Sequence, residues 1–337
     1  IGNVFVHRVG FSSFFYLAKI AFIPLATLQA LSLHRQQNFD GFWAMMVYMT
    51  FPITLARACG VRVPYTLTLQ EGDPFEYVFK RWRIRLFVPL LRYGIRRAAV
   101  VHAISVYIGG WARRMGFHGA IEIIPNGVDV AHFSQTYSAE VLEKTKAELI
   151  HKEGDIVLMH TGRMVLKNGL PDIIRALSYL PPHISFVQIG IGPNEEKLKR
   201  LAEKYGVAGR VRFLGFVSHT DMPRYLQSAD IFIRPSLSEG MGNSFIEAMA
   251  AGVPVIGTQE GGITDFLFDP EQNPDREPTG RAVEPHDPEG IARAVLRILS
   301  DMDMTKRIVE NARSMVIEKY DWERIVRDMR ARVFSQI

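Results

Sequence analysis

The chain has 337 residues, of which 47% are hydrophobic and 22% are charged. This length and composition are those of a globular protein with room for two domains that each bury a core. The net charge of +5 and the isoelectric point near 9.3 suit an anionic ligand or an anionic membrane surface. They are too modest to indicate nucleic-acid binding.

Cys59 is the only cysteine, which excludes an internal disulfide framework, and no Cys/His cluster has the spacing of zinc ligands. A reducing, cytoplasmic setting is therefore expected. The chain opens on an apolar run without the basic region and cleavage site of a signal peptide. Residues 14–33 are apolar, but Lys19, Pro24 and Gln29 interrupt them, which favours a buried or amphipathic helix over a membrane span.

The first half alternates short strands and helices. Strands are expected at residues 3–7, 39–43, 63–69, 98–103 and 121–124. Helices are expected at residues 13–34 with a bend at Pro24, from the second strand to about residue 58, at 77–97, and at 105–115 with Ser105 as the cap. This alternation predicts a parallel sheet with helices on both faces.

A polar, partly helical segment at residues 131–154 joins the halves, and the alternation then restarts. Strands are expected at residues 156–160, 185–189, 211–214, 231–233, 253–256 and 281–283. Helices are expected near residues 171–180, 195–205, 221–227, 244–251, 288–299, 304–318 and 322–333. Two doubly wound domains of this kind form a cleft at the carboxyl ends of their sheets, where open α/β folds bind ligands.

One stretch, residues 236–262, combines a strand end, a glycine-rich loop, a helix and another strand. Gly240 and Gly242 let the loop backbone approach a ligand closely, and the free N–H groups of the following helix favour an anion there. Glu239 in the loop and Glu247 in the first helical turn bracket this anion site.

These residues also allow ordinary structural explanations. Ser244 and Glu247 fit a capping box, in which Glu247 only closes the start of the helix. Glu239 could be a solvated loop acid, and Gly261 with Gly262 could be a plain turn. Their occurrence together in one unit favours the functional interpretation.

The whole pattern closely resembles the signature of retaining glycosyltransferases of family 4. The matching positions are Glu239, Glu247, residues 248–250, Gly252, residues 254–256 and Gly261–Gly262, with Gly162–Arg163 and residues 124–129 upstream and residues 280–285 and 320–322 downstream. The resemblance covers nearly all of the chain from about residue 65 onward, and the earlier part more weakly.

The resemblance implies an α/β fold of two facing Rossmann-like domains, the B-type glycosyltransferase fold. The acceptor-side domain would span residues 1–135, a linker 136–154 and the nucleotide-sugar domain 155–318, and a C-terminal helix at 319–337 would pack back on the first domain. Family members usually open with a strand, a glycine-rich loop and a further βα unit. These have no counterpart here, so an N-terminally truncated chain is expected.

Transfer from a nucleotide diphosphate sugar leaves negative charge on the diphosphate, so the site needs cations or N–H donors. Arg163 and Lys167 follow the strand that ends at Thr161, and an arginine suits phosphate oxygens. The family usually carries an Arg and then a Lys directly before a Gly, both contacting the diphosphate. Arg163 matches, whereas Asn168 stands at the Lys position and Lys167 lies one residue earlier. The alternative for both Arg163 and Lys167 is that they are ordinary surface charges that do not contact the diphosphate.

By the same resemblance, Glu239 contacts hydroxyls of the donor sugar and, with Arg163 and Lys167, forms the catalytic set. Glu247 binds the ribose hydroxyls, and the nucleobase lies near residues 215–217. The donor-binding set that the resemblance implies is Gly162, Gly240, Met241, Gly242, Asn243 and Glu247.

Some transferases hold a metal with an Asp-x-Asp motif. Asp301 and Asp303 have that spacing, but they lie late in the chain and are expected between helices. Stabilisation without a metal is therefore expected. No cofactor is expected beside the donor itself, a UDP- or GDP-linked sugar.

On the acceptor side, relatives often place a His after the strand that here ends at Leu69. This chain has Gln70, which can hydrogen-bond a sugar hydroxyl but cannot titrate. Glu71 and Asp73 are alternatives, although a turn explains both. Asn126 matches the family's hinge-side turn, where a structural role is an equal alternative.

The segment 80–97 is both basic and apolar. It could lie on an anionic membrane surface, as suits enzymes with lipid-linked acceptors, or pack on the core with a solvated basic face. The first interpretation predicts a peripheral position at the inner face of the plasma membrane and a role in cell-envelope polysaccharide synthesis.

The sequence thus predicts a retaining, hexosyltransferase-like enzyme that moves a sugar from a nucleotide diphosphate sugar to a glycan or lipid-linked acceptor, with no nucleic-acid partner. Retention in two steps needs a carboxylate nucleophile, for which no candidate stands out. The family is usually described by a same-face substitution in which the leaving phosphate takes the acceptor proton. A nucleotide-sugar epimerase of the same architecture and a non-catalytic nucleotide-sugar-binding protein are the alternatives.

Overall fold

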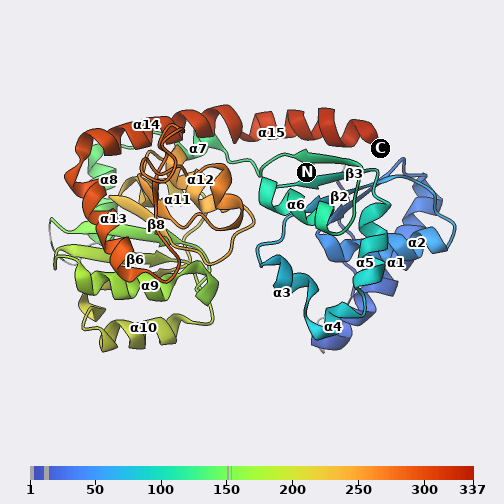
Figure 1. Ribbon diagram of the computed structural model, residues 1–337, viewed down its shortest axis with the longest axis horizontal. Coiled ribbons are helices and arrows are strands. Elements are labelled where there is room, and N and C mark those ends of the chain that lie inside the picture. The colour runs from blue at the N-terminus through green and yellow to red at the C-terminus, as the bar shows by residue number, and fades with distance from the viewer. Residues whose placement is uncertain (1–3, 11–14, 150–151, 153) are drawn as a thin grey trace. The chain divides into compact units, whose positions relative to one another are not determined.

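The computed structural model describes residues 4–10, 15–149, 152 and 154–337. The chain divides into two compact units. The first consists of Ile1–Ile124 together with Arg327–Ile337, and the second of Pro125–Val326. Each unit is built on its own parallel β-sheet with helices packed around it (Figure 1).

The first unit has a four-stranded sheet in the order β1-β2-β3-β4, with every neighbouring pair parallel. Its strands are β1 (Phe42–Met45), β2 (Tyr65–Leu69), β3 (Val100–Ala103) and β4 (Ala120–Ile123). Its helices are α1 (Phe15–Gln37), α2 (Thr50–Ala58), α3 (Phe75–Phe79), α4 (Trp82–Arg85), α5 (Val88–Arg96) and α6 (Val106–Arg114). Every residue of β2 and β3 is buried, as expected of parallel strands that helices cover on both faces.

The second unit has a six-stranded parallel sheet in the order β10-β9-β8-β5-β6-β7. Its strands are β5 (Ile156–Thr161), β6 (Ile184–Ile189), β7 (Val211–Gly215), β8 (Ile231–Arg234), β9 (Val255–Gly257) and β10 (Arg281–Ala282). The chain runs from β5 outward to β7 and then returns to the other side of β5 with β8. The strand order therefore reverses between β5 and β8, which is where open α/β sheets bind ligands.

Helices cover both faces of this second sheet (Figure 1). The helices of the second unit are α7 (Val130–Phe133), α8 (Ala139–Leu149), α9 (Leu170–Ala176), α10 (Glu195–Lys204), α11 (Met222–Gln227), α12 (Asn243–Ala250), α13 (Pro288–Ser300), α14 (Met302–Lys319) and most of α15 (Trp322–Asp328). On one face, apolar side chains of α9, α10 and α13 pack with the strands into one buried core. Burial of each large side chain there contributes about 1.5–3 kcal/mol.

Short 3₁₀ turns connect several of these elements: Val47–Met49, Leu166–Asn168, Leu177–Tyr179, Ala208–Arg210 and Gly261–Asp265. After α15 the chain continues through a π-helical turn, Met329–Val333, and a 3₁₀ turn, Phe334–Gln336, which belong to the first unit. Arg332 there forms an ion pair with Glu122 of β4 at 2.7 Å, and the Phe334 ring lies 5.0 Å from that of Trp43 in β1.

The predicted α/β class, with two parallel Rossmann-like sheets, is confirmed. All six strands predicted for the second half are present, and Ser105 caps α6 by accepting the N–H of Ile108 at 3.2 Å. The helix predicted at 13–34 is seen as α1 with Pro24 inside it, although residues 13 and 14 lie outside the described residues. Among the described helices, none combines the length and the apolar character needed to cross a membrane.

Two predicted elements are wrong. Residues 4–7 do not form a strand: Val4, Phe5 and Val6 are exposed, and no described strand pairs with them. The helix expected at 77–97 is instead three short helices, α3, α4 and α5.

Two causes divide that segment. The rings of Phe75 and Phe79 in α3 pack on Trp111 of α6, with centroids 5.5 and 5.7 Å away, which holds α3 against the core. Pro89 lies in the first turn of α5, where its missing N–H is tolerated. A helix running through Pro89 from α4 would lose a hydrogen bond and clash with the preceding turn.

Candidate functional site

The loops that follow β5 and β8 meet at the carboxyl ends of these neighbouring strands. The N–H of Leu237 donates to the carbonyl of Lys167 at 2.7 Å, so the two loops are joined through their main chains. Gly169 permits this approach, because a Cβ there would collide with the carbonyl of Pro235. The arrangement places the candidate residues of both loops in one site at the point where the strand order reverses.

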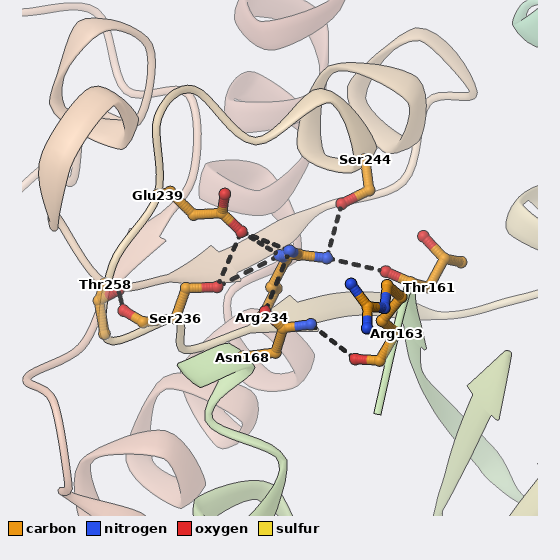
Figure 2. Close-up of polar contacts among 8 residues, drawn as sticks. All are labelled: Thr161, Arg163, Asn168, Arg234, Ser236, Glu239, Ser244 and Thr258. Atoms are coloured by element: carbon orange, nitrogen blue, oxygen red, sulfur yellow. Dashed lines mark hydrogen bonds and ion pairs between the residues drawn. The ribbon is translucent and has the colours of Figure 1, made fainter. Parts of the chain in front are cut away.

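Arg234, the last residue of β8, lies at the centre of this site, with its guanidinium pointing into the group of side chains in Figure 2. Nε donates to Oε1 of Glu239 at 2.8 Å and to Oγ of Ser236 at 3.2 Å. Nη1 donates to the carbonyl of Thr161 at 3.0 Å and to Oγ of Ser244 at 3.4 Å, and Nη2 donates to Oδ1 of Asn168 at 3.3 Å and to Oε1 of Glu239. One side chain thus connects β5, the loop after it, the loop after β8 and the start of α12.

Arg234 is not among the site residues predicted from the sequence. One feature of the sequence could have indicated that Arg234 belongs to the site. A charged residue directly after the buried run Ile231-Phe232-Ile233, at the carboxyl end of a parallel strand, lies where such folds bind ligands.

Glu239 is buried and forms an ion pair with Arg234. Its Oε1 also accepts a hydrogen bond from Oγ of Ser236 at 3.2 Å, whereas Oε2 takes part in none of these bonds and points away from the guanidinium (Figure 2). The N–H of Gly262 donates to the Glu239 carbonyl at 3.0 Å, which ties down its main chain. Glu239 is therefore a held carboxylate with one oxygen left over, and the alternative of a solvated loop acid is wrong.

The capping-box alternative is also wrong. Helix α12 begins at Asn243, directly after Gly242, and no side chain caps its first turn. Ser244 instead accepts the hydrogen bond from Arg234. The helix start thus retains the anion-binding character that the sequence suggested.

Glu247 lies in α12 and is half-buried. Burial raises the pKa of Glu247, and the nearby charges of Arg234 and His132 act in the opposite direction. No hydrogen bond to its carboxylate is found within the described part of the chain. This is the state expected of a carboxylate that gains its hydrogen bonds from a ligand.

The loop after β5 carries the two predicted cations. Arg163 is exposed, and Lys167 lies half-buried in the 3₁₀ turn Leu166–Asn168. Asn168 is buried, accepts from Arg234 and donates from Nδ2 to the carbonyl of Arg163 at 2.7 Å (Figure 2). The residue at the family's Lys position is therefore a neutral link between Arg234 and the main chain at Arg163.

A second polar layer, which the sequence did not suggest, lies beneath this loop. Gln188 of β6 donates from Nε2 to the carbonyl of Gly162 at 2.8 Å and so holds the turn after β5. His160 of β5 is fully buried beside it, and burial together with the Arg234 charge holds the pKa of His160 well below its usual range. A neutral imidazole there adds no competing positive charge beneath the site.

Asn126 lies in the second unit, at the glycine-rich loop. Its main-chain N–H donates to Sδ of Met241 and its Nδ2 to Oδ1 of Asn243, both at 3.2 Å. The predicted residues Asn126, Met241 and Asn243 are thus neighbours.

Gln70 belongs to the first unit, at the carboxyl end of β2. Its neighbour Glu71 is buried and accepts hydrogen bonds from the N–H groups of Val47 and Gln70, so Glu71 serves the fold. Asp301 of the Asp-x-Asp motif caps α14 by accepting the N–H of Met304 at 3.0 Å. Across the described residues, no group of three His, Cys, Asp or Glu side chains is arranged to hold a metal ion.

Known glycosyltransferases resemble this chain in sequence and in fold. The model of the family "glycosyl transferases group 1" matches residues 142–315, about half of the chain, and a "glycosyl transferase 4-like domain" model matches residues 2–127. A crystal structure of Anabaena HepE in complex with UDP and glucose superimposes with a TM-score of 0.81, over 97% of this chain and 85% of that chain, at 21% identity. That likeness confirms the B-type glycosyltransferase fold.

Two curated relatives are similar in sequence. An uncharacterized glycosyltransferase of Methanocaldococcus jannaschii is 31% identical over 210 residues, 62% of this chain and 52% of that protein. The GDP-mannose-dependent monoacylated alpha-(1-6)-phosphatidylinositol monomannoside mannosyltransferase of Corynebacterium glutamicum is 28% identical over 251 residues, 70% of this chain and 63% of that protein. The chain thus spans between about half and two thirds of the length of these relatives. By the family model that matches half of its length, this chain belongs to the glycosyl transferases group 1 family.

Proposed function

We propose that the protein transfers a sugar from a nucleotide diphosphate sugar to a glycan or lipid-linked acceptor. The observation that carries this proposal is the ion pair between Arg234 and Glu239 beside the uncapped start of α12. Glu239 supplies a carboxylate oxygen for sugar hydroxyls, and the start of α12 beside it supplies free N–H groups for a phosphate.

Each part of the donor then has a partner. The main chain of residues 240–243 and the first turn of α12 bind the distal phosphate, and Arg163 and Lys167 neutralise the diphosphate as its charge grows. Glu247 accepts hydrogen bonds from the two ribose hydroxyls. Glu239 binds the sugar through Oε2, and the base lies near residues 215–217 after β7.

The leaving diphosphate is stabilised by these N–H groups and cations without a metal ion, and the sugar keeps its anomeric configuration. Support for retention comes from the family signature in Glu239 and Glu247. The donor is UDP- or GDP-linked: the Corynebacterium relative is named as GDP-mannose-dependent, and the Anabaena structure holds UDP and glucose.

The acceptor side is proposed to meet an anionic membrane surface through residues 80–97. Trp82 and Leu86 are 76% and 81% exposed, and arginines at 81, 83 and 85 alternate with them. Large apolar side chains and cations exposed together suit the boundary between headgroups and acyl chains. The protein would then work as a peripheral membrane protein in cell-envelope polysaccharide synthesis, on the cytoplasmic face.

Thermal unfolding in the presence of UDP-, GDP- and ADP-sugars, with and without EDTA, tests the donor site. A ligand that binds only the folded protein raises the melting temperature by mass action. We expect one base to give the larger shift, unchanged by EDTA. No shift with any nucleotide sugar would overturn the donor site.

Incubation of the stabilising donor with lipid or glycan acceptors, followed by NMR of the product anomer, tests transfer and retention. A free sugar epimer without transfer would instead indicate an epimerase. Binding without any product, across an acceptor panel on which other family members act, would favour a non-catalytic binding protein.

Flotation with vesicles tests the membrane surface. We expect binding to phosphatidylglycerol vesicles, weakened by salt and by the pair Trp82→Ser and Leu86→Ser, and none to phosphatidylcholine vesicles. The control is Phe216→Ser, which removes an exposed aromatic ring from the second unit. Equal binding of all variants would contradict the assignment to residues 80–97.

A further inference from the structure

We propose that Arg234 is a positioning residue that sets the orientation of Glu239, so that Oε2 faces the donor sugar. The guanidinium also joins this carboxylate to the loop that carries Arg163. The inference deepens the proposed function and rests on it, because it assigns the sugar contact to Glu239.

The hydrogen bonds of the guanidinium indicate how Arg234 acts. An arginine has five N–H donors in a fixed planar fork. The single Nε–H is shared between Ser236 and Glu239, the two Nη1 donors go to Thr161 and Ser244, and the two Nη2 donors go to Asn168 and Glu239. All five donors are thus engaged by protein groups, and Arg234 acts on a ligand through those groups.

Glu239 receives the largest share of these bonds. Its Oε1 accepts from Nε and Nη2 of Arg234 and from Oγ of Ser236. The two side chains are only 12% and 10% exposed, so water screens the pair weakly. A carboxylate held in this way through one oxygen keeps the lone pairs of the other for a hydroxyl at a defined position.

The same guanidinium connects the sugar contact with the loop proposed to bind phosphate. Asn168 accepts from Nη2 of Arg234 and donates to the carbonyl of Arg163 at 2.7 Å. A shift of Glu239 would therefore disturb Asn168 and the main chain at Arg163. The bond from Asn168 to Arg163 does not involve the guanidinium itself, so the larger effect of Arg234 falls on Glu239, which it orders before the ligand arrives.

Calorimetric titration separates this role from a general contribution to folding or to phosphate binding. The probes are UDP-glucose and GDP-mannose, each paired with the sugar-free nucleotide, UDP or GDP. The variants are Arg234→Met, Glu239→Gln and the two combined. Arg293→Met, which removes an exposed arginine of α13 that pairs with Asp287, is the control.

We expect Arg234→Met to weaken the nucleotide sugar about tenfold or more and the matching nucleotide by less than about threefold. The kcat of transfer falls as well. The combined variant should be no weaker than the single ones, because Arg234 acts through Glu239 and the two effects are not additive. Arg293→Met should bind like the wild type.

Arg234→Lys covers the case in which Arg234→Met does not fold. It keeps a charge beside Glu239 and loses the planar fork, so we expect an intermediate loss for the nucleotide sugar and none for the nucleotide. If the Arg234 variants lose equal affinity for the nucleotide and the nucleotide sugar, or keep wild-type affinity for both, the inference is overturned. The proposed function would still stand. If the wild type binds neither nucleotides nor nucleotide sugars, the proposed function fails and the inference with it.

Discussion

Oε1 of Glu71 accepts a hydrogen bond of 2.6 Å from the main-chain N–H of Val47, in the turn that follows β1. Its Oε2 accepts from the N–H of Gln70, directly after β2, at 3.0 Å. One buried carboxylate therefore joins the carboxyl ends of two neighbouring strands. Burial raises the pKa of Glu71, and these backbone hydrogen bonds act to lower it.

Glu71→Gln should destabilise the protein by about 1–3 kcal/mol, because the amide presents an N–H to a buried N–H donor and leaves that donor unsatisfied. Urea unfolding measures the loss. Glu76→Gln, which changes an exposed ion pair with Arg114 in the same region, is the control and should have far less effect. Equal stability of Glu71→Gln and the wild type would show that Glu71 does not hold the two turns.

Asn168→Lys should lower the melting temperature, because it directs an ammonium toward the guanidinium of Arg234. Two unit charges about 4 Å apart repel by about 4 kcal/mol at an effective dielectric constant of 20, which is an upper limit because the lysine can swing toward solvent. Adding Arg234→Met should remove much of that loss. Leu166→Lys, which adds the same charge at an exposed position of the same loop, is the control. Strict additivity of the two changes would exclude contact between the residues.

Gly261→Ala should impair recognition of the donor sugar. Gly261 has a φ of 64°, and a Cβ there would collide with the carbonyl of Glu239. Gly252→Ala provides a matched control, because its φ of 78° imposes similar backbone strain with open space around the Cβ. Both variants should lose about 1 kcal/mol of stability through strain. Only Gly261→Ala should also weaken binding of the nucleotide sugar in calorimetry.

Glu247→Gln should make the protein more stable near neutral pH while weakening nucleotide binding. Burial raises the folded-state pKa of Glu247 above the ordinary value of 4.5, so the folded protein binds more protons than the unfolded chain between these two pKa values. Stability therefore falls as pH rises through that window, and the penalty persists above it. The neutral amide removes this dependence.

The measurement for Glu247→Gln is chemical unfolding at a series of pH values from about 4 to 8. Glu277→Gln is a control of opposite sign, because the hydrogen bond from Arg307 lowers the pKa of the exposed Glu277 carboxyl. The stability that this hydrogen bond contributes is present above the pKa of Glu277 in the unfolded chain and is lost as pH falls through its folded-state pKa. An unchanged pH profile for Glu247→Gln would show that burial does not raise the pKa of Glu247.

Central strands of the second unit could be predicted because they are short runs of β-branched and apolar residues, as in the buried run Ile231-Phe232-Ile233. The three-way division of residues 77–97 could not. It depends on Trp111, which is distant in sequence and draws Phe75 and Phe79 to the core. Helical periodicity does not report such tertiary contacts.

The site shows the same limit. The family signature predicted roles for Glu239 and Glu247 because both occupy fixed positions around a glycine-rich loop. Arg234 could not be predicted because its hydrogen bonds go to five residues from different segments, and only the folded chain brings them together. The exchange of the expected lysine for Asn168 was visible in the sequence, but its meaning needed the contact with Arg234.

The first unit is interrupted along the chain, since Arg327–Ile337 belong to it and Pro125–Val326 do not. Arg332 pairs there with Glu122, and Phe334 packs on Trp43. During synthesis, the ribosome therefore releases the entire second unit before it delivers the residues that complete the first. N-terminal domains usually fold first. Here the second unit can fold while the first unit still lacks residues Arg327–Ile337. The surface of the first unit that these residues cover, around Trp43 and Glu122, then stays exposed the longest, and a chaperone would have to shield it until they arrive.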